Sequence, residues 1–522
     1  MLSPTRIDVA AVEYGDFQTP VSFAKKVCQK VSSFYGLQPD MILEPTFGIG
    51  NFLDGIVTTF PSVRAVIGIE INADYHEHAV NKVNQHSRMR DRIELYNADI
   101  FSYDFSYIKK HLRKEDSFLI LGNPPWVTNS QLTSLGSTNL PKKSNFKGIS
   151  GLDAITGKGN FDIAEYIVLQ LLSEFAGYNC TLALLCKTIV AKNIIRDVDK
   201  YSFSATSIDL FAFSANEVFG VSCDAGLLVV QLGEHAKKIC TVYDFETNNP
   251  IRDFGWHDGT LYANINNLAS HANIDGKCQV EWRQGVKHDC CKVMELSLDD
   301  TGLFKNAMGD AYTFQLGRFV YPLVKSSDIK SFEILSTRKY VIVPQKRVNE
   351  DTSHIKVQDS LVWEYLEKYE PYLSARKSII YKNSPKYSIF GIGDYSFSKY
   401  KIGISGFYKE PIFALIMGDI PIMMDDTCYF MSFDDVKTAI ISLALLNSTT
   451  CLLFLKSIAF TDSKRPYTKE VLQRIDLEKL SEITSFDEIL DFKKSLSVKC
   501  NITESDYAKY RMSLNDAQMT LF

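Results

Sequence analysis

Hydrophobic and polar positions alternate along residues 41–232 in a rhythm of short apolar runs and longer amphipathic stretches. The apolar runs are nearly continuous, as in parallel strands covered on both faces, and the stretches between them have helical spacing. This rhythm predicts an open, doubly wound α/β sheet of the Rossmann-like kind, in which ligands bind beyond the carboxyl ends of the strands. The expected strands are 41–45, 65–71, 93–100, 117–125, 181–187 and 226–232, and the expected helices are 21–35, 51–60, 73–84 and 161–175.

The pattern changes at about Gly317. Helical spacing of apolar residues becomes sparse beyond this point, and Tyr, Lys, Ser and Gly become frequent. We therefore expect a second domain of mixed α+β structure. The predicted division is a first domain at 1–245, a linker or interdomain region at 246–316, a second domain at 317–480 and a helical C-terminal tail at 481–522.

Residues 371–410 combine basic and aromatic side chains. The segment holds seven Lys or Arg against two acidic residues and carries nine Tyr or Phe. Such a mixture suits a nucleic-acid surface, where cations meet phosphates and rings stack on bases. It suits equally well a β-rich domain with solvated lysines and core aromatics. On the first reading the candidate phosphate contacts are Arg376, Lys377, Lys382, Lys386, Lys399 and Lys401.

Composition places the chain among globular proteins of two or three domains. It has 522 residues, of which 45% are hydrophobic and 23% charged, and a net charge of −5, which excludes a disordered, collagen-like or small disulfide-bonded class. Eleven cysteines without a CxxC spacing favour free thiols in a reducing cytosol. The apolar runs are too short to span a bilayer, so we expect a soluble cytoplasmic protein with no membrane partner.

Three successive expected strands end in a carboxylate, at Glu44, Glu70 and Asp99. A turn with glycines at positions 48 and 50 follows the first strand, but it lacks the third glycine of the dinucleotide-binding fingerprint. An acid beside a two-glycine turn suits a cationic, nucleoside-like ligand such as S-adenosylmethionine. Glu70 can accept from both hydroxyls of a ribose, and Asp99 can accept from an adenine amino group.

The fourth expected strand ends in Asn123-Pro124-Pro125-Trp126. Two prolines stiffen the backbone and remove two donors, so the carbonyls there are free to accept. The Asn123 carboxamide oxygen and the Pro124 carbonyl can together accept both hydrogens of an exocyclic amine, which aims its lone pair at a methyl donor. Trp126 offers a flat face on which a base can stack, worth roughly 1–3 kcal/mol.

In this order the motifs resemble those of gamma-type adenine-N6 DNA methyltransferases of restriction-modification systems. An element similar to Gly-x-x-x-Thr-Pro occupies 14–20, a Gly-Asn-Phe-Asp element at 159–162 opens a helix, and 216–220 resembles the loop whose Phe stacks on the flipped base. The resemblance covers about 1–240. It extends more loosely to the C-terminal domain through 317–328 and 372–377.

The resemblance implies a seven-stranded mixed sheet in a catalytic domain at 1–245 and a DNA target-recognition domain at 317–480. It implies direct methyl transfer from S-adenosylmethionine to a flipped adenine in double-stranded DNA, a cognate restriction endonuclease in a separate chain, and a monomeric enzyme. The target adenine would be held by Asn123, Pro124, Pro125, Trp126 and Phe219. The donor pocket would be lined by Thr19, Pro20, Glu44, Thr46, Gly48, Gly50, Glu70, Asp99, Ile100 and Asn123.

Three other functions fit parts of the pattern. A protein glutamine methyltransferase uses a similar Asn-Pro-Pro-aromatic clamp on a side-chain amide, and an RNA guanine methyltransferase uses one on a base amine. A catalytically silent DNA-specificity subunit could keep the fold. Trp126, the early Thr-Pro element and the basic-aromatic C-terminal sequence favour a DNA methyltransferase. No metal site is expected, because His288 and its neighbouring cysteines lack a partner pair at zinc-ligand spacing.

Overall fold

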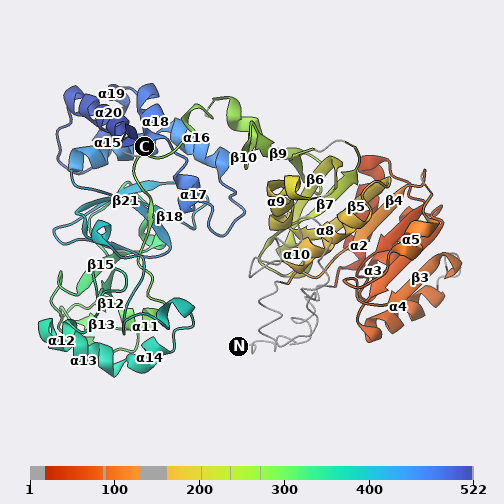
Figure 1. Ribbon diagram of the computed structural model, residues 1–522, viewed down its shortest axis with the longest axis horizontal. Helices are drawn as coiled ribbons and strands as arrows, with labels where there is room; N and C mark the ends of the chain where they lie inside the picture. The colour runs from red at the N-terminus through yellow and green to blue at the C-terminus, as the bar shows by residue number, and fades with distance from the viewer. Residues whose placement is uncertain are drawn as a thin grey trace. The chain divides into compact units, whose positions relative to one another are not determined.

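The computed structural model describes residues 18–85, 90–113, 115–127, 162–201, 203–234, 237–270 and 272–519. The chain divides into two compact units, Met1–Asn266 and Asn267–Phe522 (Figure 1). The segment 246–316, which we expected to be a linker, is shared between them. Its first strands belong to the sheet of unit 1, and its later strands belong to the sheets of unit 2.

Unit 1 is built on a ten-stranded sheet whose order is β10-β9-β8-β6-β7-β5-β4-β1-β2-β3. The strands are β1 (Met41–Glu44), β2 (Ala65–Glu70), β3 (Ile93–Asn97), β4 (Phe118–Gly122), β5 (Cys180–Lys187), β6 (Ala205–Ser214), β7 (Asp224–Leu232), β8 (Ile239–Asp244), β9 (Pro250–His257) and β10 (Thr260–Tyr262). Strands β1 to β5 pair in parallel, whereas β7 is antiparallel to both β5 and β6. The carboxyl ends of the parallel strands therefore meet at one edge of the sheet.

All six strands expected from the apolar runs are present, but the sheet has ten strands rather than seven. The additional strand β6 has the sequence ATSIDLFAFS, in which polar residues interrupt the apolar run. Strand β8 continues beyond β6 as its parallel neighbour, and β9 and β10 add an antiparallel ribbon at that edge. Strands β1 to β7 alone have the mixed, doubly wound arrangement that the sequence predicts.

The four helices predicted for unit 1 are present, but the helices at 106–111, 188–196 and 215–219 were not predicted. Apolar residues at helical spacing bury one stripe of the first helix, including Phe23, Val27 and Val31, and this helix ends at Gly36 in the left-handed conformation. The helices are α2 (Val21–Tyr35), α3 (Asn51–Thr59), α4 (Ala73–Gln85), α5 (Ser106–His111), α8 (Ile163–Glu174), α9 (Thr188–Arg196) and α10 (Ala215–Phe219).

Unit 2 contains two smaller sheets. One has the order β11-β21-β18-β19-β16, and the other has the order β14-β13-β12-β17-β15-β20. The strands are β11 (Arg283–Gln284), β12 (Glu295–Leu298), β13 (Phe304–Lys305), β14 (Ala311–Tyr312), β15 (Val320–Val324), β16 (Glu333–Ile334), β17 (Lys339–Ile342), β18 (Tyr400–Ser405), β19 (Phe413–Met417), β20 (Met423–Met424) and β21 (Cys428–Phe433).

Helices complete unit 2, with one short helix near its start, three in the middle of its sequence and the rest towards its C-terminal end. They are α11 (Cys291–Met294), α12 (Ile355–Gln358), α13 (Ser360–Lys368), α14 (Glu370–Ser374), α15 (Val436–Leu446), α16 (Thr449–Ile458), α17 (Lys469–Leu472), α18 (Leu477–Ile483), α19 (Phe486–Lys494) and α20 (Glu504–Met519). Tyr507 and Tyr510 bury their rings from α20, so the C-terminal tail packs on the unit instead of extending from it.

Among the described residues, no single helix is both long and apolar enough to cross a bilayer. Helices α15 and α16 reach that length and apolar composition only together, and they are bent by 61° at their junction. Most of α15 is buried inside unit 2.

Candidate active site

Three carboxylates lie where successive strands of unit 1 end. Glu44 is the last residue of β1, Glu70 is the last residue of β2, and Asp99 follows β3 by two residues. The register pairs Glu44 with Gly68 and Glu70 with Asn97, so the ends of these parallel neighbours coincide. Glu44 and Glu70 are 1% and 8% exposed, whereas Asp99 is half-buried.

Glu44 is buried, and its Oε2 atom has no hydrogen-bond partner among the described residues. Burial raises the pKa of this carboxyl well above its ordinary value, and the charge of Lys82 opposes the shift only in part. Lys82 itself pairs with Asp54 at 2.8 Å and donates to the Gly50 carbonyl at 2.9 Å. A buried carboxylate oxygen without a partner requires an explanation. A positively charged ligand group would supply one.

The turn between β1 and α3 requires both of its glycines. Gly48 and Gly50 have φ values of 56° and 77°, in the left-handed region that favours glycine. A Cβ atom on Gly50 would lie 2.9 Å from Leu53 Cδ1. The Gly48 amide donates to Glu70 Oε2 at 2.8 Å, and Glu70 Oε1 accepts from the Asn72 amide at 2.8 Å. Glu70 therefore holds the turns after β1 and β2 together, a role that the sequence did not reveal.

Asn123 is oriented by one hydrogen bond from its side chain and one to its backbone carbonyl. Its Nδ2 donates to Thr19 Oγ1 at 3.1 Å, and its backbone carbonyl accepts from Thr46 Oγ1 at 3.4 Å. Thr19 is only 4% exposed, and its carbonyl accepts from Asn51 Nδ2 at 2.9 Å. Because Nδ2 is directed at Thr19, the carboxamide oxygen is the atom of this side chain that can accept from a ligand amine.

Further residues of the predicted donor pocket are held by hydrogen bonds with backbone amides or with a side chain of α8. The Pro20 carbonyl accepts from the amides of Phe23 and Ala24, each at 2.9 Å, and thereby starts α2. Asp99 Oδ1 accepts from the Phe101 amide at 2.9 Å. The carbonyl of the buried Ile100 accepts from Gln170 Nε2 of α8 at 3.1 Å.

Trp126 differs from the expected open stacking face. The side chain is 3% exposed and belongs to the hydrophobic core of unit 1, and Nε1 donates to the Leu185 carbonyl at 3.2 Å. Phe219, at the end of α10, packs edge-on against it with ring centroids 5.1 Å apart. Pro124 is buried, whereas Pro125 and Phe219 are half-buried. In this structure, therefore, Trp126 supports Phe219 and does not face it across an open slot.

A lysine that was not among the predicted site residues holds the backbone that follows the two prolines. Lys187, the last residue of β5, donates from Nζ to the Trp126 carbonyl at 2.9 Å and to Asp162 Oδ2 at 2.8 Å. Asp162 is 7% exposed and caps α8 by accepting from the Ala164 amide at 3.0 Å. The signal in the sequence was a lysine ending an otherwise apolar strand. Residues 128–161, which include most of the element at 159–162, lie outside the described residues, as do 14–17 of the Thr-Pro element.

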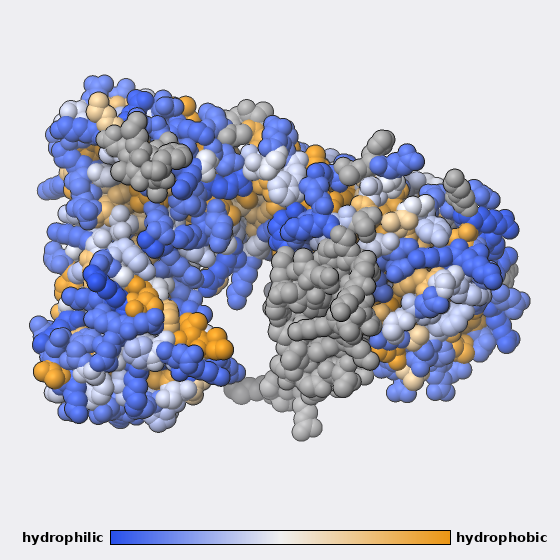
Figure 2. Space-filling view, viewed as in Figure 1, coloured by the Kyte–Doolittle hydropathy of each residue, from blue (hydrophilic) through white to orange (hydrophobic). Residues whose placement is uncertain are grey.

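Four of the six basic residues predicted to bind phosphate have exposed side chains: Lys377, Lys382, Lys386 and Lys399. Lys386 pairs with Glu370 at 2.9 Å. Hydrophilic residues cover most of the visible face of unit 2, where separate apolar areas interrupt them (Figure 2). These four exposed lysines are the members of the predicted set that can reach a phosphate from the surface of unit 2.

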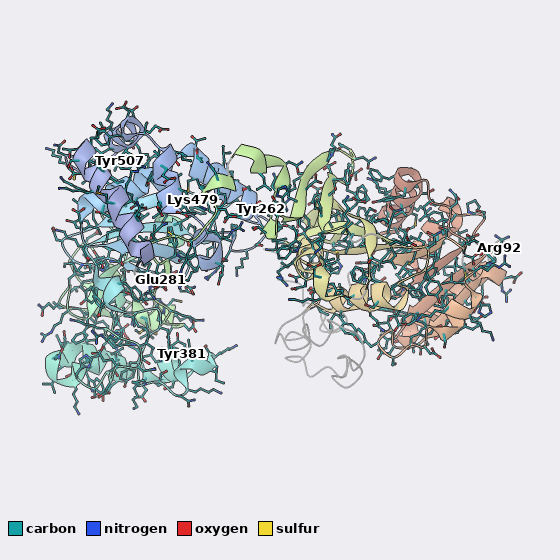
Figure 3. The ribbon with its side chains drawn as sticks, turned by 45° about the horizontal axis from the view of Figure 1, so that its top comes forward. Arg92, Tyr262, Glu281, Tyr381, Lys479 and Tyr507 are labelled. Atoms are coloured by element: carbon teal, nitrogen blue, oxygen red, sulfur yellow. The ribbon has the colours of Figure 1, made fainter. Side chains whose placement is uncertain are left out.

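Arg376 has a structural role in unit 2. Its guanidinium donates to the carbonyls of Ser388 at 2.8 Å and His288 at 3.3 Å, and it lies 3.8 Å from the ring centroid of Tyr381. Tyr381 is labelled in Figure 3. Because the donors and the flat face of Arg376 are used inside the unit, the prediction that it contacts DNA phosphates is not supported by its geometry.

The prediction that Lys401 contacts DNA phosphate is wrong. The side chain is 1% exposed in β18, and its Nζ donates to the Ser398 carbonyl at 2.5 Å. Burial lowers the pKa of Lys401 from 10.5 to about 7. Composition marked this lysine as basic surface, but its position in a central strand directs it into the interior.

Replacing Lys401 by Met is expected to change the pH dependence of stability. The folded-state pKa lies below that of the unfolded chain, so the folded protein binds fewer protons between pH about 7 and about 10, and wild-type stability rises with pH across that window. The Met variant lacks this contribution. Chemical denaturation across the window should show its advantage over wild type to be largest near pH about 7, on the order of a few kcal/mol, and to fade at higher pH. Parallel stability curves would contradict the assignment.

Among the described residues, one group of acidic and histidine side chains has atoms close enough to hold a metal ion: His288, Glu295 and Asp425 in unit 2. Lys325 Nζ already pairs with Glu295 at 2.6 Å and lies 3.6 Å from Asp425. Although burial raises the pKa of Glu295, hydrogen bonds from His288 and Lys325 lower it to about 2. Lys325 therefore already supplies the positive charge that balances these carboxylates.

Comparison with known proteins gives one close relative along nearly the whole chain. The sequence is 39% identical over 483 residues to the type II methyltransferase M.NspV of Nostoc sp., covering 91% of this chain and 99% of that protein. No protein-family model matches the chain. The fold is similar to that of the type IIL restriction-modification enzyme MmeI, solved in complex with DNA, with a TM-score of 0.54, 13% identity and coverage of 98% of this chain and 73% of that one.

Proposed function

This chain belongs to the type II methyltransferases of restriction-modification systems, and we propose that it methylates the exocyclic N6 amine of an adenine flipped out of duplex DNA. The family acts on DNA and uses S-adenosylmethionine as methyl donor. The N6 specificity rests chiefly on one observation. Asn123, which follows β4 directly, is oriented by the hydrogen bond from its Nδ2 to Thr19 Oγ1, and its carboxamide oxygen is the side-chain atom that can accept from an amine.

The acids at the sheet edge fit the methyl donor. When bound, S-adenosylmethionine supplies a methyl group on a positively charged sulfur. The buried carboxylate of Glu44, with an oxygen that has no partner among the described residues, suits the cationic part of that ligand. Glu70 and Asp99 suit the ribose hydroxyls and the adenine amine, because both can accept hydrogen bonds. Thr19, Pro20, Thr46, Gly48, Gly50 and Ile100 would complete the pocket wall.

The target amine needs orientation more than a general base. The Asn123 carboxamide oxygen and the Pro124 carbonyl would accept its two hydrogens and localise the nitrogen lone pair, and the amine would lose a proton after methylation. The stiff backbone of Pro124 and Pro125 keeps the two acceptors in place. Phe219, half-buried and supported by Trp126, is the ring that would stack on the flipped base.

Unit 2 would supply DNA affinity and sequence readout. The exposed Lys377, Lys382, Lys386 and Lys399 are the proposed phosphate contacts. The resemblance to gamma-type adenine-N6 DNA methyltransferases further implies that the chain acts as a monomer. It also implies that the cognate restriction endonuclease is a separate chain.

The substrate class is tested by offering labelled S-adenosylmethionine together with unmethylated duplex DNA, structured RNA or a protein extract. We expect the label in duplex DNA only. Label in RNA or protein amides would contradict the proposal. Donor binding without any transfer would indicate a silent specificity subunit.

Lys187→Met is expected to lower kcat on the order of 10- to 100-fold while leaving the donor Kd nearly unchanged. The reason is that Lys187 holds the Trp126 carbonyl and so positions the adjoining acceptors without touching substrate. Lys187→Arg should restore part of the rate. Lys200, whose exposed side chain pairs with Asp197 at 2.6 Å, provides a matched control as Lys200→Met. Equal losses in both Met variants, or a Lys187 variant with normal kcat, would rule out this positioning role.

A further inference from the structure

A pocket of about 500 Å³ lies in unit 2 beside the start of β15 and the short helix α12. Arg318, Lys346 and Gln358 contribute polar side chains to its lining, and Phe319 and Phe397 contribute rings. A second pocket, of about 530 Å³, adjoins it and shares Lys346 and Glu350 as lining residues. Because they share these lining residues, the two pockets form one continuous groove on the surface of unit 2.

The polar groups at this groove are available to a ligand. The exposed Arg318 guanidinium and the exposed Gln358 carboxamide form no hydrogen bond or ion pair with any residue that the structure describes. Glu350, by contrast, accepts from the backbone amides of Lys346 and Arg347, each at 2.9 Å. Asp394 is paired with Arg347 at 3.1 Å. Both acids therefore already have partners within the protein, whereas Arg318 and Lys346 form no ion pair with a described acid.

The residues behind the exposed Arg318 and Gln358 side chains are held in place by contacts within unit 2. The Tyr321 hydroxyl donates to the Arg318 carbonyl at 3.0 Å, and the Tyr321 ring packs on Phe397 with centroids 5.6 Å apart. The buried Gln345 donates to the Ile389 carbonyl at 2.7 Å and accepts from the Ile389 amide. Free donors on a rigid wall are the arrangement that recognition requires.

We propose that this groove reads base edges of the recognition sequence, with Arg318 bound to a guanine and Gln358 to an adenine. The inference rests on the proposed function and adds specificity-determining residues to it. Arginine donates two hydrogen bonds to the O6 and N7 atoms of guanine, and glutamine pairs with the N6 and N7 atoms of adenine. Lys346, at the junction of the two pockets, supplies a cation for the adjacent phosphate.

The test maps methylated sites in a library of randomised duplexes for wild type, Arg318→Ala, Arg318→Lys and Gln358→Ala. Arg318→Ala should lose discrimination at one guanine position by roughly 5- to 150-fold, Arg318→Lys should retain part of it, and Gln358→Ala should relax one adenine position. Arg511→Ala, an exposed arginine of α20, is the matched control and should keep the wild-type motif.

Two results overturn the proposal while the DNA-methylating function stands. One is an active Arg318→Ala enzyme with an unchanged motif, and the other is a loss that is uniform over all sequences, which indicates a phosphate contact. If wild type methylates no duplex at all, the proposed function fails, and the readout assignment fails with it.

Discussion

Replacing Asn123 by Ala is expected to abolish methyl transfer while largely sparing the affinity for donor and DNA. The substitution removes the carboxamide oxygen that would accept from the target amine, an interaction needed most as the nitrogen attacks. Loss of one oriented group of this kind typically lowers kcat by about 10²–10³-fold. Single-turnover methylation, with donor affinity from calorimetry and DNA affinity from anisotropy, separates chemistry from binding.

Two substitutions at Thr19 provide the control, because its hydroxyl accepts from Asn123 Nδ2 at 3.1 Å. Thr19→Ser keeps that acceptor and should keep most of the activity. Thr19→Val removes it and should reduce kcat, though less than Asn123→Ala. Full activity of the Asn123 variant would show that the amine is held elsewhere.

Glu44→Gln is expected to weaken donor binding and, at the same time, to stabilise the unliganded protein at neutral pH. The substitution removes the negative charge proposed to face the cationic ligand. A hydrogen bond to a charged group contributes about 1.5–3 kcal/mol, which corresponds to roughly 10- to 150-fold in Kd.

The gain in stability follows from the raised pKa of Glu44. The folded protein retains this proton to a higher pH than the unfolded chain does, so the stability of the unliganded wild type falls as pH rises above the ordinary value of 4.5 toward the raised pKa. Glutamine does not titrate and avoids that loss. Thermal unfolding with and without donor should show a higher Tm for the free variant and a smaller donor-induced rise.

Glu77→Gln, at an exposed position of α4, is the matched control and should behave as wild type in both measurements. A Glu44 variant that binds donor normally would remove this carboxylate from the site. A variant less stable than wild type at neutral pH would mean that a cation or donor within the protein already compensates the buried carboxylate.

Periodicity predicted unit 1 well because its central strands are apolar without interruption. β4 and β5 read as continuous apolar runs, and α2 begins and ends at the predicted residues. β6 was missed because Ser207 and Asp209 interrupt its apolar run, and the antiparallel ribbon beyond it gave no signal of its own.

Side-chain roles were harder to predict because they depend on tertiary contacts. A tryptophan after two prolines can face solvent or enter the core, and only the packing of Trp126 against Phe219 and the Leu185 carbonyl distinguishes the two. Arg376 and Lys401 count as basic in any composition, yet one donates to internal carbonyls and the other is buried. The three carboxylates at the sheet edge were predictable, since parallel strands place their carboxyl ends together.

The central claim is tested most directly by identifying the modified nucleoside. Unmethylated plasmid DNA is treated with the protein and S-adenosylmethionine bearing a labelled methyl group, digested to nucleosides and analysed by mass spectrometry, with the modified positions mapped by long-read sequencing. The account predicts labelled N6-methyldeoxyadenosine, located at one short sequence motif. A labelled cytosine, or a methyl group anywhere but on the N6 amine of adenine, would contradict it.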